Sequence, residues 1–185
     1  MDQIVRLTAA DFADAMDFCN MVFSMSSRPH HFQSLLSKLY QPDDDKMRAH
    51  FAIRRDGRIR ALVGMYPMTL RVGMQVLKVA GIGAVATHPD ERKSGLMRQL
   101  MTATVDEMKQ QQIAMSVLGG QRQRYGYYGY EPAGTSLTFS LSKTNLRHFF
   151  RDRDFATVRF ELLDPENDKN KDRKSTRLNS SHGKL

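Results

Sequence analysis

Residues 76–111 read VLKVAGIGAVATHPDERKSGLMRQLMTATVDEMKQQ, and this stretch decides the fold. Its first part, Val76–Thr87, has the apolar composition of a strand, and its last part, from about Gly95 to Gln111, repeats apolar residues at helical spacing. Gly81 and Gly83 interrupt the strand, and interior glycines often mark a bulge or a close approach of a ligand to the backbone. The stretch therefore predicts a bulged strand, a polar loop and an amphipathic helix in direct succession.

The loop between strand and helix is basic and leads into the predicted helix N-terminus. Backbone N–H groups and the positive end of the helix dipole make such a terminus a ready pyrophosphate site. Gly95 allows close approach of the backbone, and Arg92, Lys93 and Arg98 add positive charge. Strand amides left unpaired by a bulge can hold an extended ligand arm that carries amide groups. Coenzyme A combines such an arm with a pyrophosphate; a solvated loop without a ligand is the alternative.

The segment before this stretch predicts two helices. The short apolar run Ile4–Leu7 is followed by a capping pair, Thr8 and Asp11, and then by about four turns of apolar residues at helical spacing. A second, shorter helix is predicted over residues 32–39, and the run Asp43–Asp45 is predicted to be an acidic loop.

In the middle of the chain, the spacing of the apolar residues changes from that of a helix to that of a strand. His50–Arg54 is strand-like, Asp56-Gly57 is a strong two-residue hairpin signal, and Ile59–Met68 is the returning strand. Gly73-Met74 predicts a second tight turn, which leads into the glycine-containing strand. The sequence therefore predicts three consecutive strands joined by antiparallel hairpins.

Shorter elements follow the amphipathic helix. Met115–Leu118 is a short apolar strand, the aromatic and glycine-rich segment Tyr125–Tyr130 is a short helix or turn, and Ser136–Leu141 is a last strand. The complete order predicts a mixed α/β fold without internal repeats.

The bulk properties are those of a soluble globular chain. With 185 residues, 41% apolar and 26% charged, the chain is long enough for one domain with a real core. Its single cysteine, Cys19, excludes an intramolecular disulfide and is expected to be a buried packing residue. No apolar run approaches the roughly 18 residues of a membrane helix. We therefore expect no membrane association and a cytoplasmic location.

The formal net charge of +8 invites a nucleic-acid interpretation, but its placement weakens it. Much of the excess lies near the C-terminus, in the following cations: Lys169, Lys171, Arg173, Lys174, Arg177 and Lys184. From Pro165 onward the chain is too polar to bury enough surface to order itself, and Arg173–His182 has the character of translated vector sequence. Nucleic acid is therefore not expected as a partner.

Two motifs carry a resemblance to a known family. Residues 85–97, VATHPDERKSGLM, resemble the coenzyme A signature of the GNAT superfamily of N-acetyltransferases, which has a strand, a proline and then Arg/Gln-x-x-Gly-x-Gly/Ala. Met97 departs from the signature, since glycine or alanine is usual there; a bulky residue after Gly-Leu is similar to the enhanced intracellular survival branch. Residues 125–130, YGYYGY, resemble that branch's Tyr-Gly-x-Phe-Gly-Tyr, with Tyr128 in place of phenylalanine.

The resemblance covers roughly residues 1–145 and implies a GNAT-like fold, a mixed and mostly antiparallel sheet flanked by helices, with a splayed central strand. It also implies acetyl-CoA as co-substrate and direct attack on its thioester by an amine, from an aminoglycoside, a polyamine or a protein lysine. The positions that match the family's cofactor contacts are these: Val85, Ala86, Thr87, Arg92, Lys93, Ser94, Gly95, Leu96, Met97, Arg98, Gly120 and Gln121.

Tyr125 is the position that matches the family's general acid, which protonates the departing thiolate. A tyrosine with a pKa of about 10 is a weaker acid than a thiol of about 8.5, so stepwise transfer is uphill by roughly 2 kcal/mol. That deficit is tolerable if the proton moves as the carbon–sulfur bond breaks. The competing interpretation of Tyr125 is a packing aromatic in a glycine-rich turn.

Other candidate groups have weaker support in the sequence. The adjacent His30 and His31 point apart on any regular element and have no partner at ligand spacing, so no metal site is expected. His88 is expected to be structural or solvent-facing rather than a base. The Asp43–Asp45 run would attract a cationic amine, or would simply be solvated.

The resemblance also implies a longer protein. Members of the branch carry a second GNAT-like domain and a C-terminal lipid-carrier-like domain, and their general base is the carboxylate at the far end of the chain. We therefore expect a GNAT domain over residues 1–145, the start of a truncated second domain over 146–165 and a disordered, non-native tail over 166–185. The alternative to an N-acetyltransferase is a non-catalytic acyl-CoA-binding module; the oligomeric state stays open, with a homo-oligomer of the full-length form as one option.

Overall fold

A computed structural model of the chain describes residues 2–25, 28–134, 138, 140 and 142–151. The chain divides into two compact units, Met1–Glu131 and Pro132–Leu185. The described part of the second unit contains one helix, α6 (Lys143–Phe149), whose N-cap residue Ser142 accepts a hydrogen bond from the backbone N–H of Asn145 at 3.0 Å. All other elements belong to the first unit.

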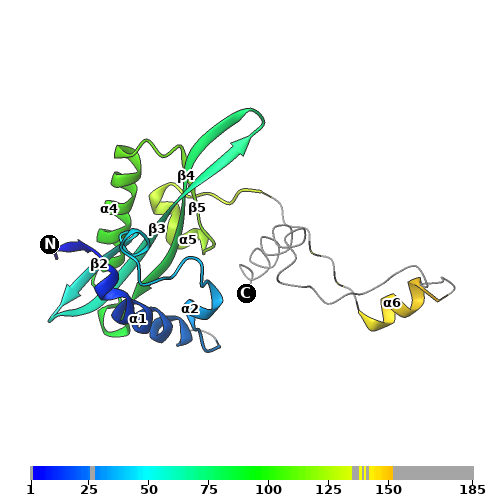
Figure 1. Ribbon diagram of the computed structural model, residues 1–185, viewed down its shortest axis with the longest axis horizontal. Helices are drawn as coiled ribbons and strands as arrows, with labels where there is room; N and C mark the ends of the chain where they lie inside the picture. The colour runs from blue at the N-terminus through cyan, green and yellow to red at the C-terminus, as the bar shows by residue number, and fades with distance from the viewer. Residues whose placement is uncertain (1, 26–27, 135–137, 139, 141, 152–185) are drawn as a thin grey trace. The chain divides into compact units, whose positions relative to one another are not determined.

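The first unit is built on a five-stranded sheet in the order β1-β2-β3-β4-β5. Its strands are β1 (Ile4–Arg6), β2 (His50–Arg55), β3 (Arg58–Val72), β4 (Gln75–Thr87) and β5 (Met115–Val117). Neighbours pair antiparallel, except that β4 and β5 run parallel. The predicted mixed α/β fold with a mostly antiparallel sheet is confirmed (Figure 1).

Both predicted hairpin turns form. Asp56 and Gly57 join β2 to β3 with φ of 51° and 73°, the left-handed conformation that a two-residue type I′ turn requires. Gly73, with a φ of 58°, starts the turn from β3 to β4. The distal part of this second hairpin projects beyond the rest of the sheet (Figure 1).

The predicted bulge lies in β4. Leu62 of β3 pairs with Ala86, but Gly64 pairs with Gly83, so one β3 residue opposes both Ala84 and Val85. Ala84 adopts a left-handed φ of 49°. The surplus residue also exchanges the two sides of the strand, because side chains alternate along it with period two.

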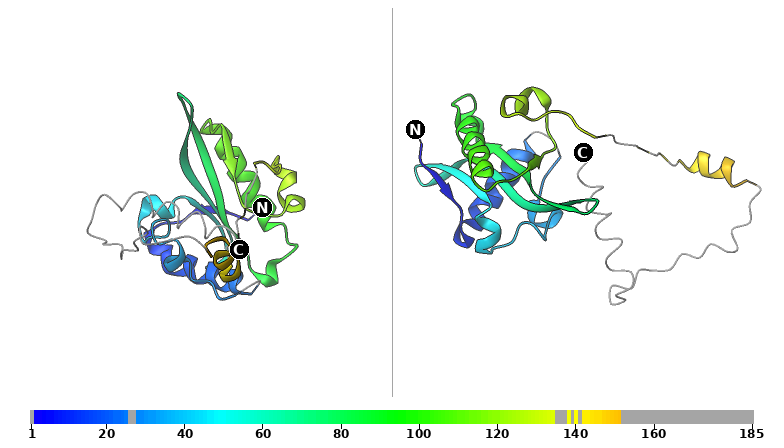
Figure 2. Two further views of the ribbon diagram at one scale, coloured as in Figure 1. Left: turned by 90° about the vertical axis from the view of Figure 1, so that its right-hand side faces the viewer. Right: turned by 90° about the horizontal axis from the view of Figure 1, so that it is seen from above.

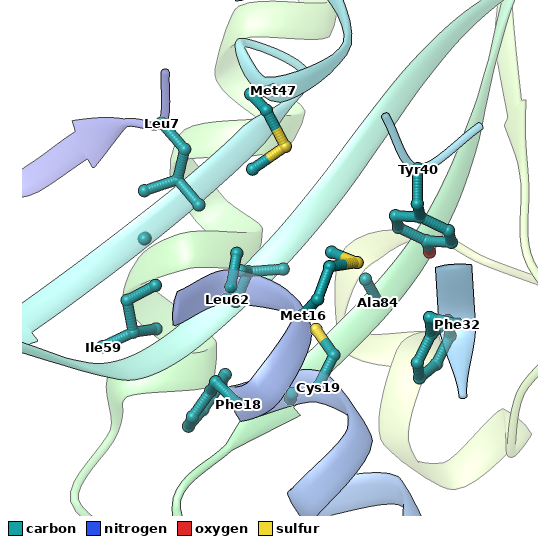
Figure 3. Close-up of a cluster of buried hydrophobic side chains, with 13 residues drawn as sticks. Leu7, Met16, Phe18, Cys19, Phe32, Tyr40, Met47, Ile59, Leu62 and Ala84 are labelled. Atoms are coloured by element: carbon teal, nitrogen blue, oxygen red, sulfur yellow. The ribbon is translucent and has the colours of Figure 1, made fainter. Parts of the chain in front are cut away.

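Helices cover both faces of the sheet (Figure 2). On one face, α1 (Phe12–Ser24) packs its buried residues against Leu62, Ala84 and Ala86 (Figure 3). On the other, α4 (Leu96–Gln110) packs against Val63, Ile82 and their neighbours. Because Ile82 faces α4 while Ala84 and Ala86 face α1, the bulge divides β4 between the two cores.

Short helices complete the described fold. They are α2 (Phe32–Leu35), α3 (Asp44–Met47) and α5 (Arg122–Tyr125), with 3-10 turns η1 (Ala9–Asp11), η2 (Pro89–Glu91) and η3 (Gly126–Tyr128). The predicted capping pair at the start of the first helix is present, since Thr8 donates its backbone N–H to the Asp11 carboxylate at 2.8 Å. Within the described ranges, no helix combines the length and apolarity needed to cross a membrane.

Two local predictions were wrong. The Asp43–Asp45 run is not a loop: Asp43 caps α3 by accepting a hydrogen bond from the Lys46 N–H at 3.1 Å, because a short acidic side chain before a helix satisfies its free donors. The helix predicted over residues 32–39 ends after Leu35, because the next residue leaves the helical region with a φ of −135°. Most of the strand predicted over Ser136–Leu141, and all of residues 152–185, lie outside the described residues.

Candidate functional site

The site begins where β4 and β5 part. Their ladder runs from the pair Val79–Met115 to the pair Gly81–Val117. Beyond it β4 continues to Thr87, paired with β3 but no longer with β5. The His88 N–H donates to the Arg60 carbonyl of β3 at 2.8 Å. Because main-chain groups alternate in direction along a strand, the amides of Val85 and Thr87 face away from β3, toward the side that β5 has left open. The predicted splayed strand is therefore present.

A cavity of about 670 Å³ occupies this open side. Its wall combines the end of α1, the outer part of β4, the basic loop, the start of α4 and two residues near α5. The lining residues are Val22, Phe23, Val85, Thr87, Glu91, Arg92, Lys93, Gly95, Leu96, Met97, Arg98, Arg124 and Tyr128. One cavity thus joins the free edge of a bulged strand to the N-terminus of a 15-residue helix.

The basic loop turns sharply before α4. Lys93 and Gly95 both adopt left-handed conformations, with φ of 69° and 85°, and Gly95 is the N-cap of α4. An added Cβ at Gly95 would meet no atom within 4 Å, so the space above this residue is open. The first N–H groups of α4 have no partner within the helix, as at every helix N-terminus, and the basic residues Arg92, Lys93 and Arg98 line the same cavity. This geometry suits a phosphorylated anion.

Eight of the twelve predicted cofactor residues line the cavity. Of the other four, Ala86 is buried against α1, and its amide faces β3. Ser94 donates its hydroxyl to the Glu91 carbonyl at 2.6 Å and so shapes the loop from within. Gly120 and Gln121 lie just before α5 and do not line the cavity.

Tyr125, the predicted general acid, ends α5 and is only 8% exposed. Its ring lies directly over Gly120, where an added Cβ would collide with it. It also packs edge-on against Tyr130, with ring centroids 6.3 Å apart, and burial raises the pKa of its hydroxyl above the ordinary tyrosine value. Tyr125 does not line the cavity, although Arg124 and Tyr128 on either side of it do.

The structure adds lining residues that the sequence did not indicate. Val22 and Phe23 carried only a helical packing signal, and Arg124 and Tyr128 lay inside or beside the aromatic motif without a role. Glu91 is the most unexpected, because it places a carboxylate in the wall of an otherwise basic site. In the sequence, Glu91 is only an acidic residue between Pro89 and the basic loop, and nothing there indicated a place in the site.

The remaining candidate groups have structural partners. His88 caps η2, with its Nδ1 accepting the Asp90 N–H at 3.3 Å. Cys19 is fully buried, and burial raises the pKa of its thiol to about 12, so the predicted packing role is confirmed. Across the described ranges there is no group of three His, Cys, Asp or Glu side chains placed to hold a metal ion.

Comparisons with known proteins agree with this fold. The family model described as "Acetyltransferase (GNAT) domain" matches residues 3–133. A comparison with curated proteins finds no significant match.

Several solved structures share the fold at low sequence identity. A protein described as a predicted acetyltransferase with acetyl-CoA, from Clostridium acetobutylicum, superposes with a TM-score of 0.63 at 14% identity, over 76% of this chain and 96% of that one. A conserved Enterococcus faecalis protein gives 0.58 at 20%, over 71% of this chain. A GCN5-related N-acetyltransferase from Anabaena variabilis gives 0.55 at 21%, over 69% of this chain. This chain spans about a third of the length of the last two, 32% and 31%.

Proposed function

Because the chain belongs to the GNAT acetyltransferase family, as its match over residues 3–133 shows, we propose that it binds acetyl-CoA in the cavity beside β4 and transfers the acetyl group to an amine. One observation carries the proposal. The outward amides of Val85 and Thr87 and the N-terminus of α4 lie in the wall of a single cavity. An amide-bearing arm joined to a diphosphate would engage both parts of that wall at once.

Each part of the wall has a distinct task in this proposal. The amides of Val85 and Thr87 bind the pantetheine arm as an added strand would be bound. The backbone from Lys93 to Arg98 binds the diphosphate, aided by the helix dipole and the basic side chains. The Val85 N–H also stabilises the negative charge that develops on the thioester oxygen during attack.

The transfer itself needs an attacking lone pair and a proton. A neutral amine attacks the thioester carbonyl carbon, the carbon–sulfur bond breaks, the thiolate takes a proton, and the nitrogen of the new amide releases one to solvent. We assign that proton to Tyr125. Burial keeps its hydroxyl protonated at neutral and moderately alkaline pH, while making it a still weaker acid. The transfer must therefore be concerted with bond cleavage.

The first test is calorimetric titration with acetyl-CoA. We expect the wild type to bind and Gly95→Glu to lose at least about tenfold in affinity, because a carboxylate at the helix N-terminus opposes the diphosphate. Gly73→Glu is the matched control: it puts the same side chain at another left-handed glycine, in the distal hairpin turn. Equal affinities of the wild type and Gly95→Glu would defeat the proposed pocket.

The alternative is an acyl-CoA-binding module without catalytic activity, as part of a longer protein. Acyl-CoA binding alone does not separate the two functions, because both predict it. A thiol-release assay with acetyl-CoA and a panel of aminoglycosides, polyamines and lysine peptides does. Release that depends on one amine class identifies the acceptor, whereas tight binding without release from any acceptor favours the module.

A further inference from the structure

The wall of the proposed diphosphate site contains a carboxylate that should oppose its ligand. Among the described residues that line the cavity, Glu91 is the only acidic one, and its side chain is 17% exposed. A fixed negative charge beside a bound diphosphate lowers affinity unless another group compensates it.

Arg55 provides the compensation from a different part of the fold. It is the last residue of β2, and its Nη1 lies 2.5 Å from Glu91 Oε2. Arg55 does not line the cavity itself. Its guanidinium thus approaches Glu91 from behind the wall rather than from the side open to a ligand.

A second carboxylate holds Arg55 in place. Asp2 accepts two hydrogen bonds from it, Nε to Oδ1 at 3.0 Å and Nη2 to Oδ2 at 2.9 Å, which is the paired geometry that fixes a guanidinium plane. Gln99 of α4 donates to the same Asp2 carboxylate at 3.4 Å. These hydrogen bonds, which Arg55 donates to Asp2, raise the pKa of Arg55 and lower the pKa of Asp2.

Glu91 also anchors the turn that precedes α4. Its main-chain carbonyl accepts the Ser94 hydroxyl at 2.6 Å and the Ser94 N–H at 3.3 Å. A tether on the Glu91 side chain therefore restrains the backbone that leads to the Gly95 cap.

We propose that Arg55 is a positioning residue of the diphosphate site, which offsets the charge of Glu91 and fixes the turn from which α4 begins. The inference rests on the proposed function, since it concerns the affinity of that site for coenzyme A. It assigns to the β2–β3 hairpin, which contributes no residue to the cavity wall, a role in cofactor affinity.

The test is a double-mutant cycle in the full chain, with coenzyme A as the probe in calorimetric titrations. We expect Arg55→Gln to weaken binding about tenfold, as for one uncompensated charge acting across a solvent-filled cavity. Glu91→Gln removes that charge but keeps the shape and the main-chain anchor, so it should bind at least as tightly as the wild type. The double variant should return to the affinity of Glu91→Gln, and exposed Arg58→Gln, in the same hairpin, should change nothing.

The outcomes separate this inference from the proposed function. Coenzyme A binding by the wild type with unchanged affinity in Arg55→Gln overturns the inference alone. Weaker binding that the double variant does not restore also overturns it, because Arg55 would then act only through the fold. Thermal unfolding of each variant identifies that case. Absence of coenzyme A binding by the wild type overturns the proposed function and the inference together.

Discussion

At the scale of single residues, Tyr125 occupies a position that both of its interpretations explain. Its ring fills the space above Gly120 and contacts Tyr130, which is what a packing aromatic does. Its neighbours Arg124 and Tyr128 line the cavity, whereas Tyr125 itself does not, so the general-acid role rests on the motif. Only removal of the hydroxyl with retention of the ring distinguishes the two roles.

We expect Tyr125→Phe to lower acetyl transfer by about 100-fold or more, the usual contribution of a general acid, while leaving acetyl-CoA affinity nearly unchanged. Steady-state kinetics and calorimetry measure the two quantities separately. Tyr127→Phe is the control, because Tyr127 belongs to the same motif and is 90% exposed. Loss of affinity or of thermal stability in Tyr125→Phe would instead identify a structural residue.

The same tyrosine predicts how the proposed acetyl transfer depends on alkaline pH. Burial raises the pKa of Tyr125 above 10, so the protonated form persists to higher pH than for an exposed tyrosine. If Tyr125 sets it, the loss of transfer activity on the alkaline side should therefore have its midpoint at a higher pH than an exposed tyrosine would give. A decline that begins well below pH 10 in the wild-type pH–rate profile would assign the limiting proton to another group.

At the scale of elements, the bulge in β4 depends on an alanine in a conformation that disfavours side chains. A left-handed φ costs a residue with a Cβ about 1–2 kcal/mol, and Ala84 is also buried against α1. Glycine there would relieve the strain, but it would lose a buried methyl group and add freedom to the unfolded chain. These effects nearly cancel.

We therefore expect Ala84→Gly to stay within about 1 kcal/mol of the wild type in free energy of unfolding. Ala84→Val should cost about 2–4 kcal/mol, from backbone strain together with overpacking, and should weaken acetyl-CoA binding. Urea unfolding and calorimetry check both. Ala86→Val is the control, because it overpacks the same cluster at a residue whose φ is not left-handed. An equal loss of unfolding free energy in the two valine variants would show that the bulge is not strained.

The bulge also shows why its existence was predictable and its position was not. Gly81 and Gly83 indicated it, yet neither has a left-handed φ. At Gly83 an added Cβ would lie 3.2 Å from the Tyr66 ring, which is a tight contact, whereas at Gly81 it would lie 3.5 Å from the end of Met68, an ordinary one. The glycine signal therefore arose from packing across the sheet, which the sequence alone does not place.

The candidate site likewise has one part that the sequence predicts and another that it does not. The loop and helix N-terminus from Arg92 to Arg98 follow from local sequence, because a turn, a cap and a helix are local structures. The end of α1 and the Arg55–Glu91 ion pair reach the site through tertiary packing, over separations of tens of residues. Hairpins and α4 were predictable for the same local reason, and α3 was missed because an acidic run serves equally as a solvated loop or as a helix cap.

At the scale of the whole molecule, part of the net positive charge lies in a stretch of sequence apart from the proposed site. Residues 166–185 contain six basic and three acidic residues, a net +3 of the chain's +8. The cavity lies entirely within the first compact unit, Met1–Glu131. The tail thus contributes net charge that lies outside the compact unit with the cavity, while a net +5 remains in residues 1–165.

We expect a chain truncated after Pro165 to keep the acetyl-CoA affinity of the full chain within about twofold, and to lose any retention of duplex DNA at physiological salt. Calorimetry and a gel-shift assay at two salt concentrations measure the two properties. DNA retention that survives the truncation would locate a polymer-binding surface in the remaining residues and would revive the nucleic-acid interpretation.

The bulge in β4 adds one residue to the strand without changing the pairing on either side of it. Removing Ala84 would leave Val85 alone opposite Val63, and the pairs Leu62–Ala86 and Gly64–Gly83 on either side of the bulge could both be kept. The side chains before and after the bulge would keep their faces, because these pairs already lie in register. A single inserted residue can thus reshape the free edge of a strand while the rest of the sheet keeps its pairing.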